Sequence, residues 1–331
     1  MNLENIVELA FFGDDFTGST DALEFLSRAG LRTVLVLDDP TPEMLKRFGN
    51  LDAMGVAGMT RAMPPEEISK TLEKSFSVLK RLNPRHIHYK VCSTFDSSPE
   101  TGSIGTAIET GQKIFQNKFT PVLVAAPHLG RFSAFGNLYA RMGIGSQGAI
   151  HRLDRHPSMC AHPITPATES DLRLHLAKQT KLSIGLIDLV DLENPEKVIL
   201  AKLNNRIDSG DKILFFDAMY KQQMKVIGKI FDYKAGEKSP LFSVGSSGVE
   251  KALGDHWASE GKFEERTEWE PLSESKPLLV LSGSVSPVTA DQIIWAGKNG
   301  FELIGIELEG IQADNPDAHI EKYLRQSLNF F

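Results

Sequence analysis

Short apolar runs recur along the chain, and most of them are separated by stretches with helical periodicity. The runs are continuously hydrophobic rather than alternating between apolar and polar residues, which is typical of strands buried on both faces of a parallel sheet. We therefore expect an α/β fold with a mostly parallel sheet covered by helices on both faces. The expected strands are residues 7–13, 33–38, 53–58, 86–91, 121–127, 212–217, 240–245 and 277–283.

Two segments carry complete start and stop signals for helices. In the first, Thr17 or Ser19 can cap a helix that Gly30 closes. In the second, Pro64 and Pro65 open a helix, acidic residues follow at its positive end, and a proline after its basic last turn stops it. Both segments support the α/β prediction.

The pattern changes twice along the chain. Residues 130–167 lack a clear period and are rich in Gly, Pro, His and Ser, so we expect an ordered excursion with short hairpins or loops. Residues 254–277 are polar and charged, which favours a linker. The expected domains are thus residues 1–253, the linker 254–277, and a second, incomplete α/β domain over 278–331.

Composition excludes several classes of protein. The 331 residues include 36 Lys and Arg against 43 Asp and Glu, a net charge of −7 spread along the chain, which argues against a nucleic-acid partner held by phosphate contacts. Cys92 and Cys160 are the only cysteines, too few for a disulfide framework. Acidic residues near the start and the lack of a long apolar run predict no membrane partner and a cytoplasmic protein.

Most of the unusual polar clusters follow directly after expected strands. In open parallel sheets, ligands bind outside the carboxyl ends of the strands, so the sequence predicts one ligand-facing edge. The clusters are residues 13–18, 60–61, 90–94, 127–131, 245–248 and 282–286.

The first cluster places two adjacent aspartates, Asp14 and Asp15, between a strand and a helix start. A carboxylate there can take a hydroxyl proton or help to hold a metal, and the helix N-terminus can hold an anion. Either aspartate can instead cap the helix. We expect one capping and one functional aspartate.

Cations and hydroxyls follow the next strands. Arg61 and Lys90 can each pair with a carboxylate or phosphate, or form a structural salt bridge. Ser93, Thr94 and Ser97 add hydroxyl groups beside Lys90, although Ser and Thr are also common in turns. This combination suits a polyhydroxylated acid.

Three other sequence patterns could indicate a different kind of site. Gly143, Gly145 and Gly148 match G-x-G-x-x-G, but they lack the strand and helix that a dinucleotide fingerprint requires, and no Walker A pattern occurs. The histidines 151, 156 and 162 lack helical metal-ligand spacing, which favours a loop over a metal site. A hydrolase using Cys92 or Ser246 as nucleophile is a further alternative without a supporting motif.

The motifs GDDFTGSTDALEFL, TRAMP, YKVCSTFDSS, VGSSGVEKAL and LSGSVSPVTADQI occur in this order, and together they resemble the four-carbon acid sugar kinase family. The resemblance runs from about Phe11 to about Ile293. It implies an enzyme that uses ATP, with Mg²⁺, to phosphorylate the terminal hydroxyl of a four-carbon sugar acid such as threonate, erythronate or an oxo-tetronate. In that family the N-terminal domain binds the sugar acid and the C-terminal domain binds the nucleotide.

The resemblance also implies roles for single residues. Asp14 and Asp15 match the family's D-D-x-T-G motif at the sugar site, with Asp15 as the expected catalytic base and Asp14 as the alternative. Arg61 matches a family arginine after the third strand. The expected substrate-binding run is Lys90, Val91, Cys92, Ser93 and Thr94, and the expected ATP-binding residues are Ser284, flanked by Ser282 and Ser286.

The chain departs from the family pattern in two places. Asp96 stands where family members commonly have a cation, so the substrate is expected to differ from that of better-known members. The family's C-terminal glycine-rich motif does not occur before Phe331, so we expect a shortened nucleotide domain. The leading hypothesis is a sugar-acid kinase, a homodimer being also compatible. The alternative is a catalytically silent sugar-acid-binding relative that has lost part of its nucleotide site.

Overall fold

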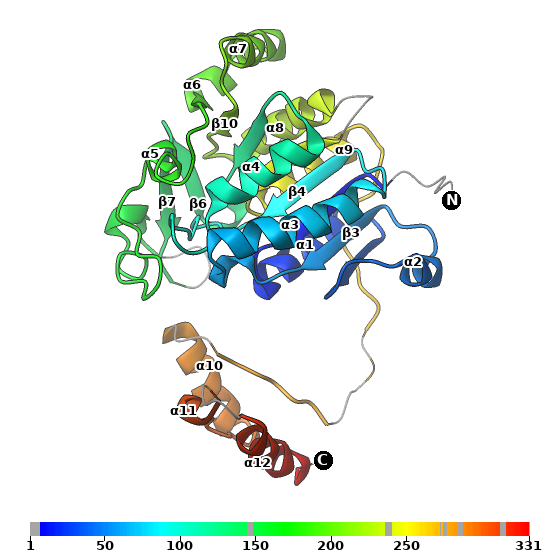
Figure 1. Ribbon diagram of the computed structural model, residues 1–331, viewed down its shortest axis with the longest axis vertical. Coiled ribbons are helices and arrows are strands. Elements are labelled where there is room, and N and C mark those ends of the chain that lie inside the picture. Colours follow the sequence, from blue (N-terminus) through cyan, green and yellow to red (C-terminus); the bar gives the residue numbers. More distant parts are fainter. Residues whose placement is uncertain are drawn as a thin grey trace. The chain divides into compact units, whose positions relative to one another are not determined.

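Figure 1 shows the computed structural model of the chain. The structure describes residues 7–143, 148–235, 240–271, 273, 277–283, 287–311 and 316–330. It divides the chain into two compact units, Met1–Thr267 and Glu268–Phe331. The predicted sheet lies in the first unit.

The first unit is built on one sheet of eight strands. These are β1 (Leu9–Gly13), β2 (Thr33–Val36), β3 (Ala53–Ala57), β4 (His86–Lys90), β5 (Thr120–Leu123), β9 (Ile184–Ile187), β10 (Ile213–Phe216) and β11 (Leu241–Gly245). Their order is β2-β3-β1-β4-β11-β5-β10-β9, and all neighbours pair in parallel. The predicted α/β fold is confirmed.

Helices cover both faces of this sheet (Figure 1). They are α1 (Phe16–Arg28), α2 (Pro42–Phe48), α3 (Pro65–Lys80), α4 (Ile104–Phe115), α5 (Leu172–Leu176), α6 (Leu189–Leu192), α7 (Glu196–Asp208), α8 (Lys221–Lys234) and α9 (Gly248–Ser259). Side chains alternate between the two faces along each strand. In β1, Ala10 and Phe12 pack in the core under α3 and α4, whereas Leu9 and Phe11 pack in the core under α1, α8 and α9.

The expected helices form with one difference at a cap. Helix α3 begins at Pro65 with glutamates in its first turn, as the sequence predicts. Helix α1 is capped by Asp15, not by Thr17 or Ser19, because the Asp15 carboxylate accepts a hydrogen bond from the Gly18 amide. The chain therefore enters α1 two residues earlier than the threonine signal indicates.

A small antiparallel sheet forms within the predicted excursion. Its strands are β6 (Arg131–Ala134), β7 (Asn137–Arg141) and β8 (Ile150–Arg152). The Ser133 amide donates to the Ala218 carbonyl just after β10, and the Ala126 and Arg131 backbones pair just after β5. The small sheet is thus attached at the carboxyl edge of the large one.

The strand order reverses between β1 and β4. After β3 the chain crosses β1 to form β4 on its other side, so the loops after β1 and β4 diverge at this point. Such a switch point leaves a crevice at the carboxyl edge, where open α/β sheets bind their ligands.

The second unit contains α10 (Pro287–Lys298), α11 (Leu308–Ile311) and α12 (Asp317–Leu328). The strand predicted over residues 277–283 does not form, and Leu278, Leu279, Val280 and Leu281 are exposed. That prediction was wrong for a physical reason: a strand needs a neighbour to pair with, and the described part of this unit offers no other strand.

Candidate functional site

Backbone hydrogen bonds tie together the loops that follow β1, β3 and β4. The Asp14 amide donates to the Lys90 carbonyl over 2.9 Å, and the Arg61 amide donates to the Asp14 carbonyl over 3.0 Å. A short 3₁₀ helix, Thr60–Ala62, follows β3 and carries Arg61. Three of the sequence-predicted residues, Asp14, Arg61 and Lys90, are therefore brought together at the switch point.

The Arg61 guanidinium binds both aspartates at once. Its Nη2 and Nε atoms donate to the two carboxylate oxygens of Asp14 over 2.6 and 3.1 Å. Its Nη1 and Nη2 atoms donate to the two oxygens of Asp15, each over 2.9 Å. A planar fork of this kind fixes both carboxylates, so the main work of Arg61 in this structure is to orient the aspartate pair.

The two aspartates have different surroundings. Asp14 is 2% exposed, and burial raises its pKa from 3.8 to about 6 even though Arg61 and Lys90 oppose the shift. Asp15 is more exposed, and its carboxylate also caps α1 through the Gly18 amide at 2.8 Å. Asp15 is therefore the capping aspartate. The functional role expected of the other aspartate, Asp14, stays a prediction.

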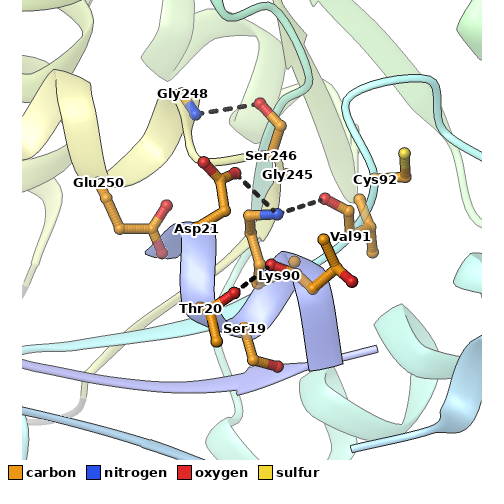
Figure 2. Close-up of polar contacts among 12 residues, drawn as sticks. Ser19, Thr20, Asp21, Lys90, Val91, Cys92, Gly245, Ser246, Gly248 and Glu250 are labelled. Carbon is orange, nitrogen blue, oxygen red and sulfur yellow. Dashed lines mark hydrogen bonds and ion pairs between the residues drawn. The ribbon is translucent and has the colours of Figure 1, made fainter. Parts of the chain in front are cut away.

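Lys90 is a buried cation beside this pair. Its side chain is 2% exposed, its Nζ donates to the Val91 carbonyl over 3.1 Å, and the nearest carboxylate oxygen of Asp21 on α1 lies 3.4 Å away. Figure 2 shows these two contacts meeting at the Lys90 ammonium. An ammonium has three donors, so the third is available to a ligand as far as the described residues show.

Gly18 lies directly against the Lys90 ammonium. A Cβ atom at this position would lie 3.1 Å from the Lys90 Nζ and 2.5 Å from an Asp15 carboxylate oxygen. The glycine of the D-D-x-T-G motif therefore lets the start of α1 approach both charged groups.

The rest of the predicted binding run has mixed surroundings. Val91 is fully buried in the core and contributes its carbonyl to Lys90. Ser93 is half-buried, and Thr94 is buried with its hydroxyl 2.8 Å from the Cys92 sulfur. Burial raises the pKa of Cys92 to about 11, so this thiol stays protonated at neutral pH and is a poor nucleophile.

The VGSSG motif forms a tight turn between β11 and α9 next to Lys90 (Figure 2). The Ser246 hydroxyl donates to the Val124 carbonyl over 2.8 Å and accepts from the Gly248 amide over 3.0 Å. Ser246 is therefore fully engaged in the turn, and the geometry gives no support to its role as a hydrolase nucleophile.

Sequence reasoning missed a buried polar group behind the site. His88 on β4 and Glu250 on α9 are both fully buried, and the His88 Nδ1 lies 2.5 Å from a Glu250 carboxylate oxygen. Asp21 was missed as well, and burial raises its pKa while Lys90 opposes the shift. An acidic residue among the apolar residues of a helix could have indicated such a buried group. Glu250, close to Val249 and Ala252 in α9, is an example.

The remaining candidate patterns are the glycines and the histidines between residues 143 and 162. Residues 144–147 of the glycine pattern lie outside the described residues. His151 and His156 pack ring against ring at 5.7 Å, and the described residues contain no group of three or more His, Cys, Asp or Glu side chains placed to hold a metal.

The expected nucleotide residues belong to the second unit. Ser282 is exposed and lies in a segment without helix or strand. Ser284 and Ser286 lie outside the described residues, so their expected role remains a prediction.

The chain is similar in sequence to proteins named as kinases of sugar acids. It is 38% identical to the 3-oxo-isoapionate kinase of Paraburkholderia graminis over 95% of this chain, and 29% identical to the 3-oxo-tetronate kinase of Salmonella typhimurium over 87%. The chain spans 65% and 64% of the lengths of these relatives. A crystal structure from Salmonella typhimurium LT2 matches with a TM-score of 0.74 and 26% identity, covering 97% of this chain and 71% of that one.

None of the helices within the described ranges has the length and apolar character that crossing a bilayer requires. The family model for the sugar-binding N-terminal domain matches residues 9–253, which contain the whole of the site around Asp14, Arg61 and Lys90. The chain therefore belongs to the family of this sugar-binding domain, that of the four-carbon acid sugar kinases.

Proposed function

We propose that this chain binds a four-carbon sugar acid and serves an ATP-dependent kinase that phosphorylates the terminal hydroxyl of that acid. The acid is of the threonate, erythronate or 3-oxo-tetronate type, or the related 3-oxo-isoapionate. The names of the relatives support the reaction class. The observation that carries the proposal is Asp14, a buried carboxylate at the switch point with a pKa raised to about 6.

Asp14 is the base that the geometry favours. A general base works best when its pKa lies near the working pH, and Asp14 meets this condition while remaining mostly ionised above pH 6. In the reaction, the substrate hydroxyl gives its proton to Asp14 as its oxygen forms a bond to the γ-phosphorus of ATP. The bond from that phosphorus to the bridging oxygen breaks, and ADP leaves. Arg61 holds both aspartates, but Asp15, the base expected from the sequence, has the cap of α1 as an additional partner.

The two cations, Arg61 and Lys90, orient the groups of the site and neutralise negative charge. Arg61 holds the aspartate pair in one orientation, and the Lys90 ammonium offers its free donor to an oxygen of the acid or of the transferred phosphoryl group. Because phosphoryl transfer needs little covalent help from the protein, such positioning supplies most of the catalysis.

A resident metal site does not fit the residues of the first unit. Both aspartates after β1 are taken by Arg61, and the part of the chain that the structure describes has no other cluster of metal-ligating side chains. We therefore propose that any Mg²⁺ arrives bound to the phosphates of ATP, and we assign no step to it. Nucleotide binding is assigned, as part of the same proposal, to residues 278–331 with Ser282, Ser284 and Ser286.

The test is an assay of phosphoryl transfer by the chain itself. The protein is incubated with ATP, Mg²⁺ and one acid at a time: threonate, erythronate, 3-oxo-tetronate or 3-oxo-isoapionate. A product heavier by one phosphoryl group is expected by mass spectrometry with at least one acid. A folded protein that phosphorylates none of them would overturn the kinase proposal. Calorimetry with the same acids would then tell a silent binding protein from one that does not bind them.

A further inference from the structure

Three basic residues of β4 point toward the helices on one face of the large sheet, and each meets a carboxylate from a different helix. The residues alternate along the strand, and all three are buried. The pairs are His86 with Asp232 on α8 at 3.0 Å, His88 with Glu250 on α9 at 2.5 Å, and Lys90 with Asp21 on α1 at 3.4 Å. The third pair is the one at the carboxyl edge, where the aspartate site lies.

The pair of Lys90 and Asp21 differs from the pair of His88 and Glu250. Both members of the histidine pair are fully buried, whereas the Asp21 side chain is 30% exposed. The Lys90 ammonium ends a flexible four-carbon chain, so its direction depends on the groups that hold it. In this structure those groups are the Val91 carbonyl and the Asp21 carboxylate, which Figure 2 shows on two sides of the ammonium.

The aspartates after β1 are the alternative partners of this ammonium. A Cβ atom at Gly18 would lie 3.1 Å from Lys90 Nζ and 2.5 Å from an Asp15 carboxylate oxygen, so these two charged groups flank the same glycine. The Asp14 amide also donates to the Lys90 carbonyl. Even so, Lys90 is in ion-pair contact with Asp21 and not with Asp14 or Asp15, which Arg61 holds.

The hydrogen bonds of Asp14 show why this choice of partner matters. Each of its two carboxylate oxygens accepts one hydrogen bond from Arg61, and each has room for a second. The remaining lone pairs are those that can take the proton of a substrate hydroxyl. An ammonium that turned from Asp21 to Asp14 would occupy one of them and stabilise the ionised carboxylate, which makes a weaker base.

We propose that Asp21 is a positioning residue, which holds the Lys90 ammonium against α1 and so keeps it from pairing with Asp14. This inference rests on the proposed role of Asp14 as the base. Asp21 acts through Lys90 and touches no reacting atom. The simpler view is that Asp21 only completes the row of pairs inside the fold, and the experiment separates the two.

Several charged groups determine how easily Asp14 gains a proton. Burial raises the pKa of Asp14 to about 6, Arg61 opposes the shift, Asp15 adds to it, and Lys90 opposes it. A closer Lys90 would therefore lower the pKa of Asp14 further. The titratable and charged groups that face Asp14, Lys90 or Asp21 are Asp15, Arg61, Tyr89 on β4 and Glu250 on α9.

The experiment follows the titration of Asp14 itself, by NMR of the full chain labelled with ¹³C at the aspartate carboxyl groups. The Asp14 signal is the one that Asp14→Asn lacks. The variants are Asp21→Asn, Lys90→Met and the two combined, with Lys90→Gln in place of Lys90→Met if the latter gives no cooperative melting transition. Glu24→Gln is the matched control, because Glu24 lies one turn along α1 and pairs with Arg28 in solvent.

About half of Asp14 should be ionised at pH 6 in the wild type. Asp21→Asn should shift its midpoint to lower pH, so that the ionised form exceeds the protonated form by about 10-fold at pH 6, the effect of one close opposite charge. Lys90→Met should shift the midpoint to higher pH. In the Lys90→Met background, Asp21→Asn should change the midpoint much less, because the group through which Asp21 acts is gone.

The conservative variant and the control complete the expected pattern. Asp21→Glu keeps the counter-charge of Lys90 and should titrate like the wild type, and so should Glu24→Gln. With an acid that the chain phosphorylates, kcat of Asp21→Asn should fall by about 10-fold, and the rise of kcat/KM should move to lower pH together with the titration.

Two results would overturn the role of Asp21: an Asp14 midpoint that Asp21→Asn leaves unchanged, or a shift of the same size with and without Lys90. The second result would mean that Asp21 acts on Asp14 directly through its charge. The titration needs no turnover, so it is independent of the phosphorylation assay. A chain that phosphorylates no sugar acid would overturn the proposed function, whereas an unchanged midpoint in an active chain would overturn only this inference.

Discussion

At the scale of single residues, identical side chains acquire different chemistry from their surroundings. Asp14 and Asp15 are neighbours in sequence and share one guanidinium, yet only Asp14 is fully buried. Burial penalises the ionised form, and for Asp14 this effect exceeds the stabilisation that Arg61 provides. Asp15 gives its carboxylate to the start of α1 instead. The observed cap, Asp15, and the proposed base, Asp14, thus differ in solvent exposure.

The raised pKa of Asp14 predicts the pH dependence of the reaction. A base must be ionised to accept a proton, so kcat/KM should rise with pH through about 6 and then level off. Asp14→Asn should lower kcat by at least about 100-fold, the usual contribution of a general base, and remove this rise. Asp15→Asn is the matched comparison. It should weaken the cap of α1 and the hydrogen bonds from Arg61, but kcat/KM should still rise with pH near 6. A pH profile that survives in Asp14→Asn and disappears in Asp15→Asn would reverse the assignment.

At the scale of helices and strands, one carboxylate joins three elements at the amino end of the sheet. Asp232 on α8 accepts from Arg85 Nε at 2.9 Å, lies 3.0 Å from His86 Nε2 at the start of β4, and accepts from the Trp257 indole of α9 at 3.2 Å. These partners hold the pKa of Asp232 well below its usual range. Because α9 also carries Glu250, the contact between Asp232 and Trp257 helps to fix the position of Glu250 next to His88.

Asp232→Ala should destabilise the fold by about 2–4 kcal/mol, because it leaves buried donors of His86 and Trp257 without a partner. The stabilisation depends on the ionised carboxylate, so it is present above the ordinary pKa of 3.8 and is lost as the pH falls below it. Urea unfolding at pH 7 measures the difference. Asp255→Ala on α9, whose partner is Lys251 one turn away, should cost only about 0.5 kcal/mol. Equal losses for the two variants would contradict the role of Asp232.

The elements were predictable from the sequence to different degrees. Seven of the eight sheet strands were predicted from apolar runs, and in β1 and β11 the run ends in Gly followed by polar residues. Strand β9 was missed because Gly185 interrupts the apolar run of Ile184–Ile187, which leads almost directly into the helix Leu189–Leu192. Asp14, Arg61 and Lys90 were found because each lies at the carboxyl end of an expected strand or just after it. Their pairing was not predictable, since burial and guanidinium geometry depend on contacts between distant parts of the chain.

At the scale of the whole molecule, the chain divides into units with very different cores. Both large hydrophobic clusters of the described structure consist of residues up to Phe263, all in the first unit. In the second unit, Tyr323 is the one buried apolar side chain among the described residues, and large side chains such as Leu281 and Trp295 are exposed. The first unit therefore has its own source of stability.

This division predicts that a chain ending at Thr267 folds and binds sugar acids by itself. It retains every strand of the large sheet, both clusters, and the site residues Asp14, Arg61 and Lys90. Its melting temperature should stay within a few degrees of the main transition of the full chain, and its threonate affinity within about twofold, a difference of about 0.4 kcal/mol.

The matched control is a chain that ends at Ser247. It keeps all eight strands but lacks α9, and with it the buried side chains of Val249, Leu253 and Trp257 and the carboxylate that His88 contacts. Because a large core face and a buried histidine would then lose their partners, this shorter chain should fail to give a cooperative melting transition. If the chain ending at Thr267 failed in the same way, residues 268–331 would be required for the fold, and the first unit would not be an independent sugar-acid domain. If it folded but did not bind an acid that the full chain binds, the binding site would need the second unit.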